Sequence, residues 1–163
     1  YNDVIAQKNG RYEYGSGLYL TTHYETARKY SKGNRKLYKI TVEKGADINN
    51  SFLPIDIVTN FINTYVIKVK RKEVFERLSK YVDNGNIKAY IFNNIMLNTN
   101  AMKSTNIVHL RQFYVDNNID YEIVNNPFGW GEKMMVLYNM KKIVNIQQIG
   151  PKDKIDNYDL NNF

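Results

Sequence analysis

The sequence has no cysteine, only 3 prolines and only 2 histidines in its 163 residues. Without cysteine the chain has no disulfide framework, no thiolate metal site and no thiol nucleophile. His23 and His109 are too few to build a zinc centre from histidine ligands, so we expect no metal cofactor. His109 lies inside a predicted helix, where histidine is more often a surface or core residue than a catalyst, and we interpret it as structural.

Long hydrophobic runs are also missing. No apolar stretch approaches the roughly 20 residues that a membrane-spanning helix needs. The chain also has no signal-peptide pattern. We therefore expect a soluble protein in the cytoplasm, with no membrane partner.

The remaining composition is that of a folded domain. Hydrophobic residues make up 43% of the chain and aromatic residues 13%, which is too much for a disordered protein. A chain of 163 residues is long enough to bury one core. We expect a single domain over residues 1–150 and a polar C-terminal tail over residues 151–163.

The charge of the chain is positive. The 23 basic side chains outnumber the 16 acidic ones and give a formal net charge of +7, which favours an anionic partner such as nucleic acid or the diphosphate of a dinucleotide. The densest basic run, Lys68, Lys70, Arg71 and Lys72, lies at the start of a predicted amphipathic helix over residues 70–82. This run is either a solvated face or a nucleic-acid-binding site that holds a phosphate backbone, helped by the helix N-terminus.

The stretch from Tyr14 to Ser31 has the most informative pattern in the chain. Gly15 and Gly17 allow backbone conformations that are closed to other residues, or a close approach to a ligand. Residues 18–21, Leu-Tyr-Leu-Thr, are a compact β-prone run and predict a short strand.

The residues after this strand predict a capped helix. Thr22 and Glu25 have the spacing of a capping box, in which each side chain bonds a backbone N–H near the other. The helix should begin at about Tyr24 and should carry Ala27 and Tyr30 on its inner face.

The spacing of apolar residues predicts further elements along the chain. Strands are expected over residues 37–42, 120–124 and 144–149 and from residue 132 onward, and helices over 3–9, 55–64, 70–82 and 104–117. The helix over 70–82 should bury Val74, Leu78, Tyr81 and Val82. Residues 65–69 either extend the preceding helix or form a strand, and residues 87–98 fit either element.

The glycine-containing stretch resembles the second motif of ADP-ribosyltransferases, the diphtheria-toxin-like and poly(ADP-ribose)-polymerase-like enzymes. That motif is a Gly-x-Gly strand with an apolar-Tyr-apolar run, followed by a helix with Ala and Tyr. The resemblance implies that Tyr19 and Tyr30 stack on either side of the nicotinamide of bound NAD, and that Gly17, Tyr19, Tyr30 and Ser31 bind this co-substrate. Without the family, two aromatic residues around a capped turn are more often core than ligand platform. The matching residues are Gly15, Gly17, Leu18, Tyr19, Leu20, Ala27, Tyr30 and Ser31.

The C-terminal part is similar to the third motif of the same enzymes, Glu-[Tyr/Trp]-[Ile/Val]-Val-[Tyr/Phe]-[Asn/Asp]. Here Glu132 opens an apolar strand that ends in Tyr138 and Asn139, and the usual position of the family's glutamate falls on Met134. An offset of two residues keeps the Glu132 side chain on the same strand face, displaced by about 7 Å along it. Glu132 is therefore the candidate catalytic residue, and the alternative is an ordinary carboxylate at the edge of a strand.

The chemistry of these enzymes requires such a carboxylate. Cleavage of the nicotinamide–ribose bond produces an oxocarbenium-like ribose, and a positioned anion stabilises its charge. The family's first motif, a strand with a His or Arg that holds the adenosine ribose, is not found ahead of Tyr14. Either that strand lies in a segment missing from this chain, or another residue takes its role, or the site is incomplete.

The resemblance implies an α+β fold with split antiparallel β-sheets and flanking helices. It also implies a mono-ADP-ribosyltransferase that uses NAD and transfers ADP-ribose to a nucleic acid or protein acceptor. Small basic transferases of this kind suggest a bacterial or phage-conflict toxin, and an intracellular toxin normally needs a neutralising antitoxin partner.

Two alternative functions fit the same residues. An RNA 2′-phosphotransferase resembles the same fold and also consumes NAD, but it depends on an arginine-rich phosphate site. A catalytically degenerate transferase fold that serves as a nucleic-acid- or protein-binding module would show salt-sensitive RNA binding and no NAD turnover.

Overall fold

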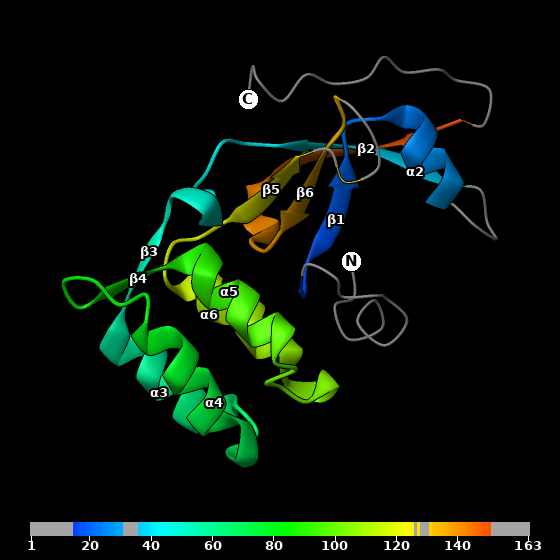
Figure 1. The fold of residues 1–163 in the computed structure, drawn as a ribbon. Coiled ribbons are helices and arrows are strands. Elements are labelled where there is room, and N and C mark those ends of the chain that lie inside the picture. Colours follow the sequence, from blue (N-terminus) through cyan, green and yellow to red (C-terminus); the bar gives the residue numbers. More distant parts are fainter. Residues whose placement is uncertain (1–14, 31–35, 126, 128–130, 151–163) are drawn as a thin grey trace.

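The computed structural model describes residues 15–30, 36–125, 127 and 131–150, and it combines antiparallel β-sheets with α-helices (Figure 1). The strands are β1 (Leu18–Thr21), β2 (Leu37–Val42), β3 (Phe52–Pro54), β4 (Asn86–Lys88), β5 (Tyr121–Asn125), β6 (Lys133–Leu137) and β7 (Ile143–Ile149). The α-helices are α2 (Tyr24–Tyr30), α3 (Ile55–Tyr65), α4 (Lys68–Ser79), α5 (Ala89–Asn98) and α6 (Ile107–Asp116). Short 3-10 turns lie at Ile48–Asn50 (η1), Ser104–Asn106 (η2) and Met140–Lys142 (η3). The α+β class is therefore confirmed.

The strands of the main sheet have the order β1-β6-β5, so β6 lies in the middle with an antiparallel neighbour on each side. The register pairs Val136 with Tyr19 on one side and with Glu122 on the other. Residues opposite each other in an antiparallel pair project from the same face of the sheet. Tyr19, Val136 and Glu122 therefore form one row across that face.

Two smaller antiparallel sheets complete the strands. β2 pairs with β7, with a bulge between Thr41 and Val42, and β3 pairs with β4. The β2–β7 ribbon carries the two strands predicted over residues 37–42 and 144–149, and both predictions are confirmed.

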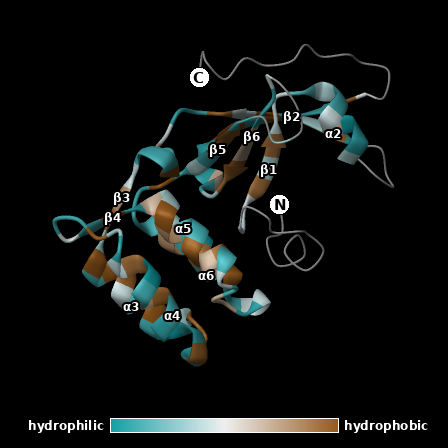
Figure 2. Cartoon of the chain, in the orientation of Figure 1, coloured by the Kyte–Doolittle hydropathy of each residue, from teal (hydrophilic) through white to brown (hydrophobic). Residues whose placement is uncertain are grey.

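The main sheet is covered on both faces, because successive residues of a strand point to opposite sides. Met134, Val136 and Tyr138 face the helices and belong to the large core cluster, whereas Met135, Leu137 and Tyr121 form a smaller cluster on the other face. Figure 2 shows hydrophobic residues along β1, β5 and β6 and hydrophobic and hydrophilic residues alternating along α3 to α6.

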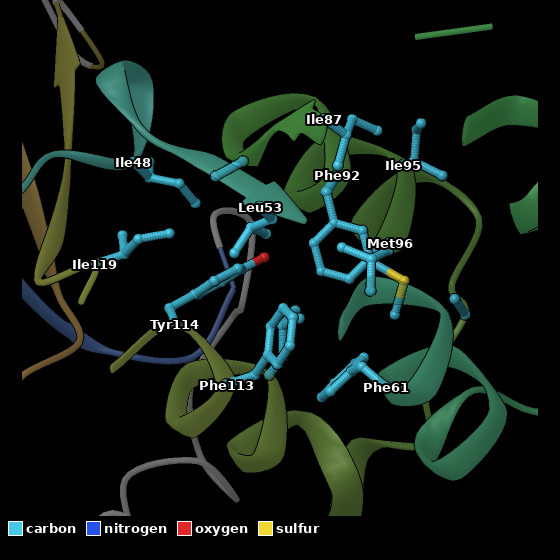
Figure 3. Packing of buried hydrophobic residues seen from close by; sticks show 14 of the residues in the cluster. Ile48, Leu53, Phe61, Ile87, Phe92, Ile95, Met96, Phe113, Tyr114 and Ile119 are labelled. Carbon is cyan, nitrogen blue, oxygen red and sulfur yellow. The ribbon is translucent and has the colours of Figure 1, made fainter. Parts of the chain in front are cut away.

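Aromatic rings from α3, α5 and α6 meet in the large core (Figure 3). The ring centroids of Phe61 and Phe113 are 4.6 Å apart, and those of Phe92 and Phe113 are 5.7 Å apart. Tyr114 joins these rings to the sheet, since its ring lies 5.0 Å from that of Tyr138. The helices are thereby fixed against the face that carries Tyr19 and Glu122.

The ambiguous segment 65–69 is neither an extended helix nor a strand. α3 ends at Tyr65, and α4 begins at Lys68 after a short turn. The N–H of Ile67 donates to the carbonyl of Ala101 at 2.9 Å, and Nε of Arg71 donates to the carbonyl of Val66 at 3.1 Å. These bonds satisfy backbone groups that the end of a helix leaves unpaired.

The segment 87–98 contains both of the elements considered for it, because β4 ends at Lys88 and α5 begins at Ala89. The helix predicted over 70–82 is present as α4, but it lies nearer the N-terminus than expected: it begins at Lys68 and ends at Ser79. Tyr81 and Val82 were predicted to be buried, which is wrong: they are 51% and 37% exposed. They lie beyond the last helical turn, so the 3.6-residue period no longer directs them inward.

A buried aspartate ties the ends of β5 and β6 to the segment after β2. The Asp120 carboxylate accepts from the backbone N–H of Ala46 at 2.8 Å and from Nδ2 of Asn139 at 2.8 Å. A Cβ on Gly45 would lie 2.9 Å from Cγ of Asp120 and closer still to its Oδ2, so a larger residue at this position would displace the carboxylate. The strand predicted over 120–124 is present, shifted by one residue, because Asp120 serves this contact.

Several predicted features lie outside the described residues. They are the helix over 3–9, Ser31 and the tail over 151–163. No helix in the described part of the chain is long and apolar enough to cross a membrane.

Candidate functional site

Gly17 is needed for packing. A Cβ at this position would lie 2.7 Å from Cγ1 of Val136 and 2.9 Å from the carbonyl oxygen of Leu137, both on β6. Gly15 has a positive φ of 89°, a conformation that L side chains rarely adopt. Both glycines thus have a structural role in bringing the start of β1 against β6.

Tyr19 points toward the helical core. It is partly buried and packs against the large core cluster, and its hydroxyl donates to the carbonyl of Gly15 at 2.5 Å. The environment of this ring is the one expected for a core aromatic residue.

Tyr30 has a different environment. It is the last residue of α2 and is 67% exposed. The prediction that it lies on an inner face of the helix is therefore wrong, because α2 has no buried residue among its 7 residues. The structure places Tyr19 in packed surroundings and Tyr30 at the surface, and Ser31 follows outside the described residues.

The start of α2 at Tyr24 is confirmed, but the predicted capping box is not formed. The Thr22 hydroxyl instead donates to the backbone carbonyl of Lys133 at 3.1 Å and bonds Nδ1 of His23 at 3.0 Å. The side chain of Thr22 thus extends the pairing of β1 and β6 by one residue, and α2 begins where that pairing ends.

Glu132 lies at the start of β6, beside the end of β1. Its carboxyl group accepts from Oγ1 of Thr21 at 2.6 Å, and only 4% of the residue is exposed. Thr21 Oγ1 also accepts from the backbone N–H of His23 at 3.1 Å. The hydrogen bond joins residues 111 positions apart in the chain and brings the two segments that resemble transferase motifs into contact.

Met134 occupies the position of the family's usual glutamate and is a core residue. It is 5% exposed, pairs with Thr21 across the β1–β6 ladder and belongs to the large cluster. A carboxylate at Met134 would be buried among apolar side chains. Glu132 is the acidic residue that this strand places nearest to that position.

A second carboxylate was not predicted from the sequence. Glu122 on β5 faces the helical core, and its Oε2 accepts from the hydroxyl of Tyr138 at 3.3 Å. Nearby, the hydroxyl of Tyr114 donates to Oδ1 of Asn93 at 2.7 Å. The pKa of Glu122 is raised to about 7, mainly because the carboxyl group is buried. The hydrogen bond from Tyr138 lowers this pKa, and the neighbouring Asp47 carboxylate raises it. The sequence does contain one signal for this burial: Glu122 lies two residues before Val124, so both side chains point to the same face of the strand, and Val124 packs against the core.

The raised pKa of Glu122 predicts that the free energy of unfolding falls as the pH rises. Its pKa of about 7 lies above the ordinary value of 4.5, so the folded protein holds more protons than the unfolded chain between these values. The neutral Glu122→Gln variant should gain up to about 3 kcal/mol over the wild type at pH above 7 and little below pH 4.5. Thermal unfolding of both proteins at several pH values measures this difference in stability. A difference that stays the same at every pH would contradict the prediction.

The basic run lies far from Glu132 in the fold. Lys68, Lys70, Arg71 and Lys72 are in the first turns of α4, in the helical layer, whereas Glu132 precedes β6 near α2 (Figure 1). Arg71 bonds the end of α3, and Lys72 lies 3.9 Å from Glu76. The structure therefore does not bring this run and the carboxylate together.

Known proteins do not assign a family to this chain. No protein-family model matches it, and no curated protein or solved structure shows significant similarity. Within the described residues no three His, Cys, Asp or Glu side chains are grouped so that they would hold a metal ion. The case for a function therefore depends on the residues themselves, above all on the contact between Thr21 and Glu132.

Proposed function

We propose that the protein is an NAD-dependent mono-ADP-ribosyltransferase with Glu132 as its catalytic carboxylate. The observation that carries this proposal is the 2.6 Å hydrogen bond between Thr21 Oγ1 and Glu132 Oε1, which holds the carboxylate at the end of the Gly-x-Gly strand. The separation of the strands into a main sheet and a β2–β7 ribbon supports the ADP-ribosyltransferase-like form of the α+β fold.

In this proposal the bond between the nicotinamide nitrogen and ribose C1′ breaks, and nicotinamide leaves with the electron pair. Glu132 stabilises the positive charge that develops on the ribose. The acceptor nucleophile then forms a bond to C1′ from the opposite face and loses its proton. Holding NAD and the acceptor in the reactive geometry makes the transfer effectively unimolecular, and this positioning contributes a large part of such rate accelerations.

The two tyrosines have different roles in this proposal. Tyr30, at the surface of α2, stacks on the nicotinamide, while Tyr19 supports the strand from the core side. The acceptor is a nucleic acid or a protein. A transferase that modified such a component of its own cell would need a neutralising partner, so an antitoxin belongs to the same proposal.

The test is to incubate the purified chain with labelled NAD and a cell lysate, with and without nuclease, and to measure nicotinamide release and label transfer. Release with label in nuclease-sensitive material supports transfer to nucleic acid, and label in protease-sensitive material supports transfer to protein. No release with any lysate fraction would contradict the proposed activity.

Tyr30 gives a separate prediction. Tyr30→Ala should lower kcat/KM for NAD about tenfold, because one aromatic stacking partner of a ring contributes on the order of 1 kcal/mol or more. Tyr30→Phe should retain most of the activity, since the ring face remains. Tyr38→Ala, at a tyrosine that is 50% exposed on β2, is the matched control. Equal losses in the Tyr30→Ala and Tyr38→Ala variants would refute the assigned role.

A binding module without catalysis is the second candidate. It is favoured by Met134, which fills the usual glutamate position with a core side chain, and by the packed environment of Tyr19. It predicts no nicotinamide release together with salt-dependent binding of nucleic acid.

A further inference from the structure

Acidic residues are missing from two long segments of the chain. The sequence has no Asp or Glu between Asp56 and Glu73, and none between Asp83 and Asp116. These segments contain most of α3, the start of α4, all of α5 and most of α6. Their basic residues are Lys68, Lys70, Arg71, Lys72, Lys88, Lys103 and Arg111.

The two segments meet at one end of the helical layer. The N–H of Ile67 donates to the carbonyl of Ala101 at 2.9 Å, and the rings of Tyr65 and His109 stack with centroids 4.4 Å apart and an interplanar angle of 18°. Figure 1 shows the α3–α4 turn and the start of α6 together at the end of the molecule opposite α2. Lys103, which precedes η2, thus lies on the same end as the α4 lysines.

Three lysines at this end are available to an anion. Lys68 and Lys103 are exposed and Lys70 is partly exposed. None of the three forms an ion pair with another residue in the described part of the chain. Arg71 and Lys72 are less available, because Arg71 bonds the carbonyl of Val66 and Lys72 lies 3.9 Å from Glu76.

A series of aromatic ring contacts joins α3 to α6 close to the turn that precedes Lys68. It runs from Phe113 to Phe61 at 4.6 Å, from Phe61 to Tyr65 at 5.0 Å, and from Tyr65 to His109 at 4.4 Å. Phe113 and Phe61 are buried, whereas Tyr65 and His109 are partly exposed. The His109 ring therefore rests on Tyr65, which packs on the buried Phe61, and its partial exposure leaves part of it accessible to a further flat ring.

We infer that Tyr65, His109, Lys68, Lys70 and Lys103 form a surface that binds single-stranded nucleic acid. Lysines spaced around an aromatic platform match a strand whose phosphates need cations and whose unpaired bases stack on rings. A duplex keeps its bases stacked inside the double helix, so its phosphates can contact the lysines but its bases cannot stack on the rings. This basic–aromatic surface is separate from Glu132, and its binding needs no NAD, so it stands or fails independently of the transferase activity.

The charge contribution is tested with the triple variant Lys68→Gln, Lys70→Gln, Lys103→Gln in the full chain. The probe is a fluorescent oligouridylate of about 20 nucleotides, and its anisotropy is measured without NAD. The triple variant should bind at least about tenfold more weakly and should show a salt slope lower by about two. The matched control replaces Lys29, Lys39 and Lys141, all exposed elsewhere, with glutamine. An equal loss in the control would overturn the assignment, because total charge would then explain the binding.

The stacking contribution is tested at His109. His109→Ala should weaken binding of the single strand about tenfold and leave binding of a duplex of the same length unchanged. His109→Phe should keep the affinity for the single strand, and thermal unfolding checks that both variants are folded. An oligothymidylate bound with similar affinity supports the same surface. Preference for the duplex, or tighter binding to phosphatidylserine vesicles than to the oligonucleotide, would overturn the inference.

Discussion

Replacing Glu132 with glutamine is expected to lower the rate of nicotinamide release from NAD by at least about 100-fold, because one positioned electrostatic group is commonly worth that much in a transition state. Glutamine keeps an oxygen that accepts from Thr21 Oγ1, so the 2.6 Å contact and the fold should persist. What the variant loses is the negative charge beside the developing oxocarbenium ion. The change should therefore appear in kcat more than in KM for NAD.

The control for this experiment is Glu25→Gln. Glu25 is exposed in the first turn of α2, close in sequence to Thr21, and removing its charge alters the general field at this end of the molecule by the same amount. A thermal unfolding curve for each variant shows that the fold is kept. Unchanged turnover in the Glu132→Gln variant would show that this carboxylate is a structural residue at the start of β6.

Local signals in the sequence predicted those elements whose causes are local. The apolar run at 18–21 forms β1, and the helix after it begins at Tyr24 as expected. The helix over 55–64 is present as α3, with Val58, Phe61 and Ile62 buried at helical spacing. The conformations of these elements depend on a few neighbouring residues, and the tertiary contacts of the fold favour the same conformations.

The predictions that failed concern which side of an element is buried. Tyr30 lies at the end of a helix of 7 residues that buries none of its side chains, so spacing within the helix could not identify an inner face. Thr22 has a capping spacing with Glu25 but bonds Lys133 on a neighbouring strand. A pattern within a short stretch of sequence cannot show that β6 will lie beside Thr22 in the fold.

The candidate site shows the same division. Glu132 was identified from the strand that follows it, but its partner Thr21 is 111 residues away and became apparent only in the fold. Glu122 was not identified, because its burial depends on α5 and α6 covering that face of the sheet. Similarly, the Tyr65–His109 stack joins two helices that are separate in the sequence.

Replacing Asp120 with alanine should cost about 3 to 5 kcal/mol of unfolding free energy, a large share of the stability of a domain this size. The buried carboxylate accepts from the Ala46 N–H and from the Asn139 side chain, and alanine leaves both donors without an acceptor. Hydrogen bonds to a charged group contribute more than neutral ones, and an unsatisfied buried donor adds its desolvation cost.

The consequence should be loosening of the contact between the chain after β2 and the ends of β5 and β6. Chemical denaturation measures the loss, and hydrogen exchange should show faster exchange at Ala46 and at Tyr138, whose N–H bonds the Asp120 carbonyl. Asp116→Ala is the matched control, because Asp116 is exposed on α6 and bonds only Gln112 among the described residues. If the Asp120→Ala and Asp116→Ala variants unfold at the same denaturant concentration, the carboxylate is not the group that holds these segments together.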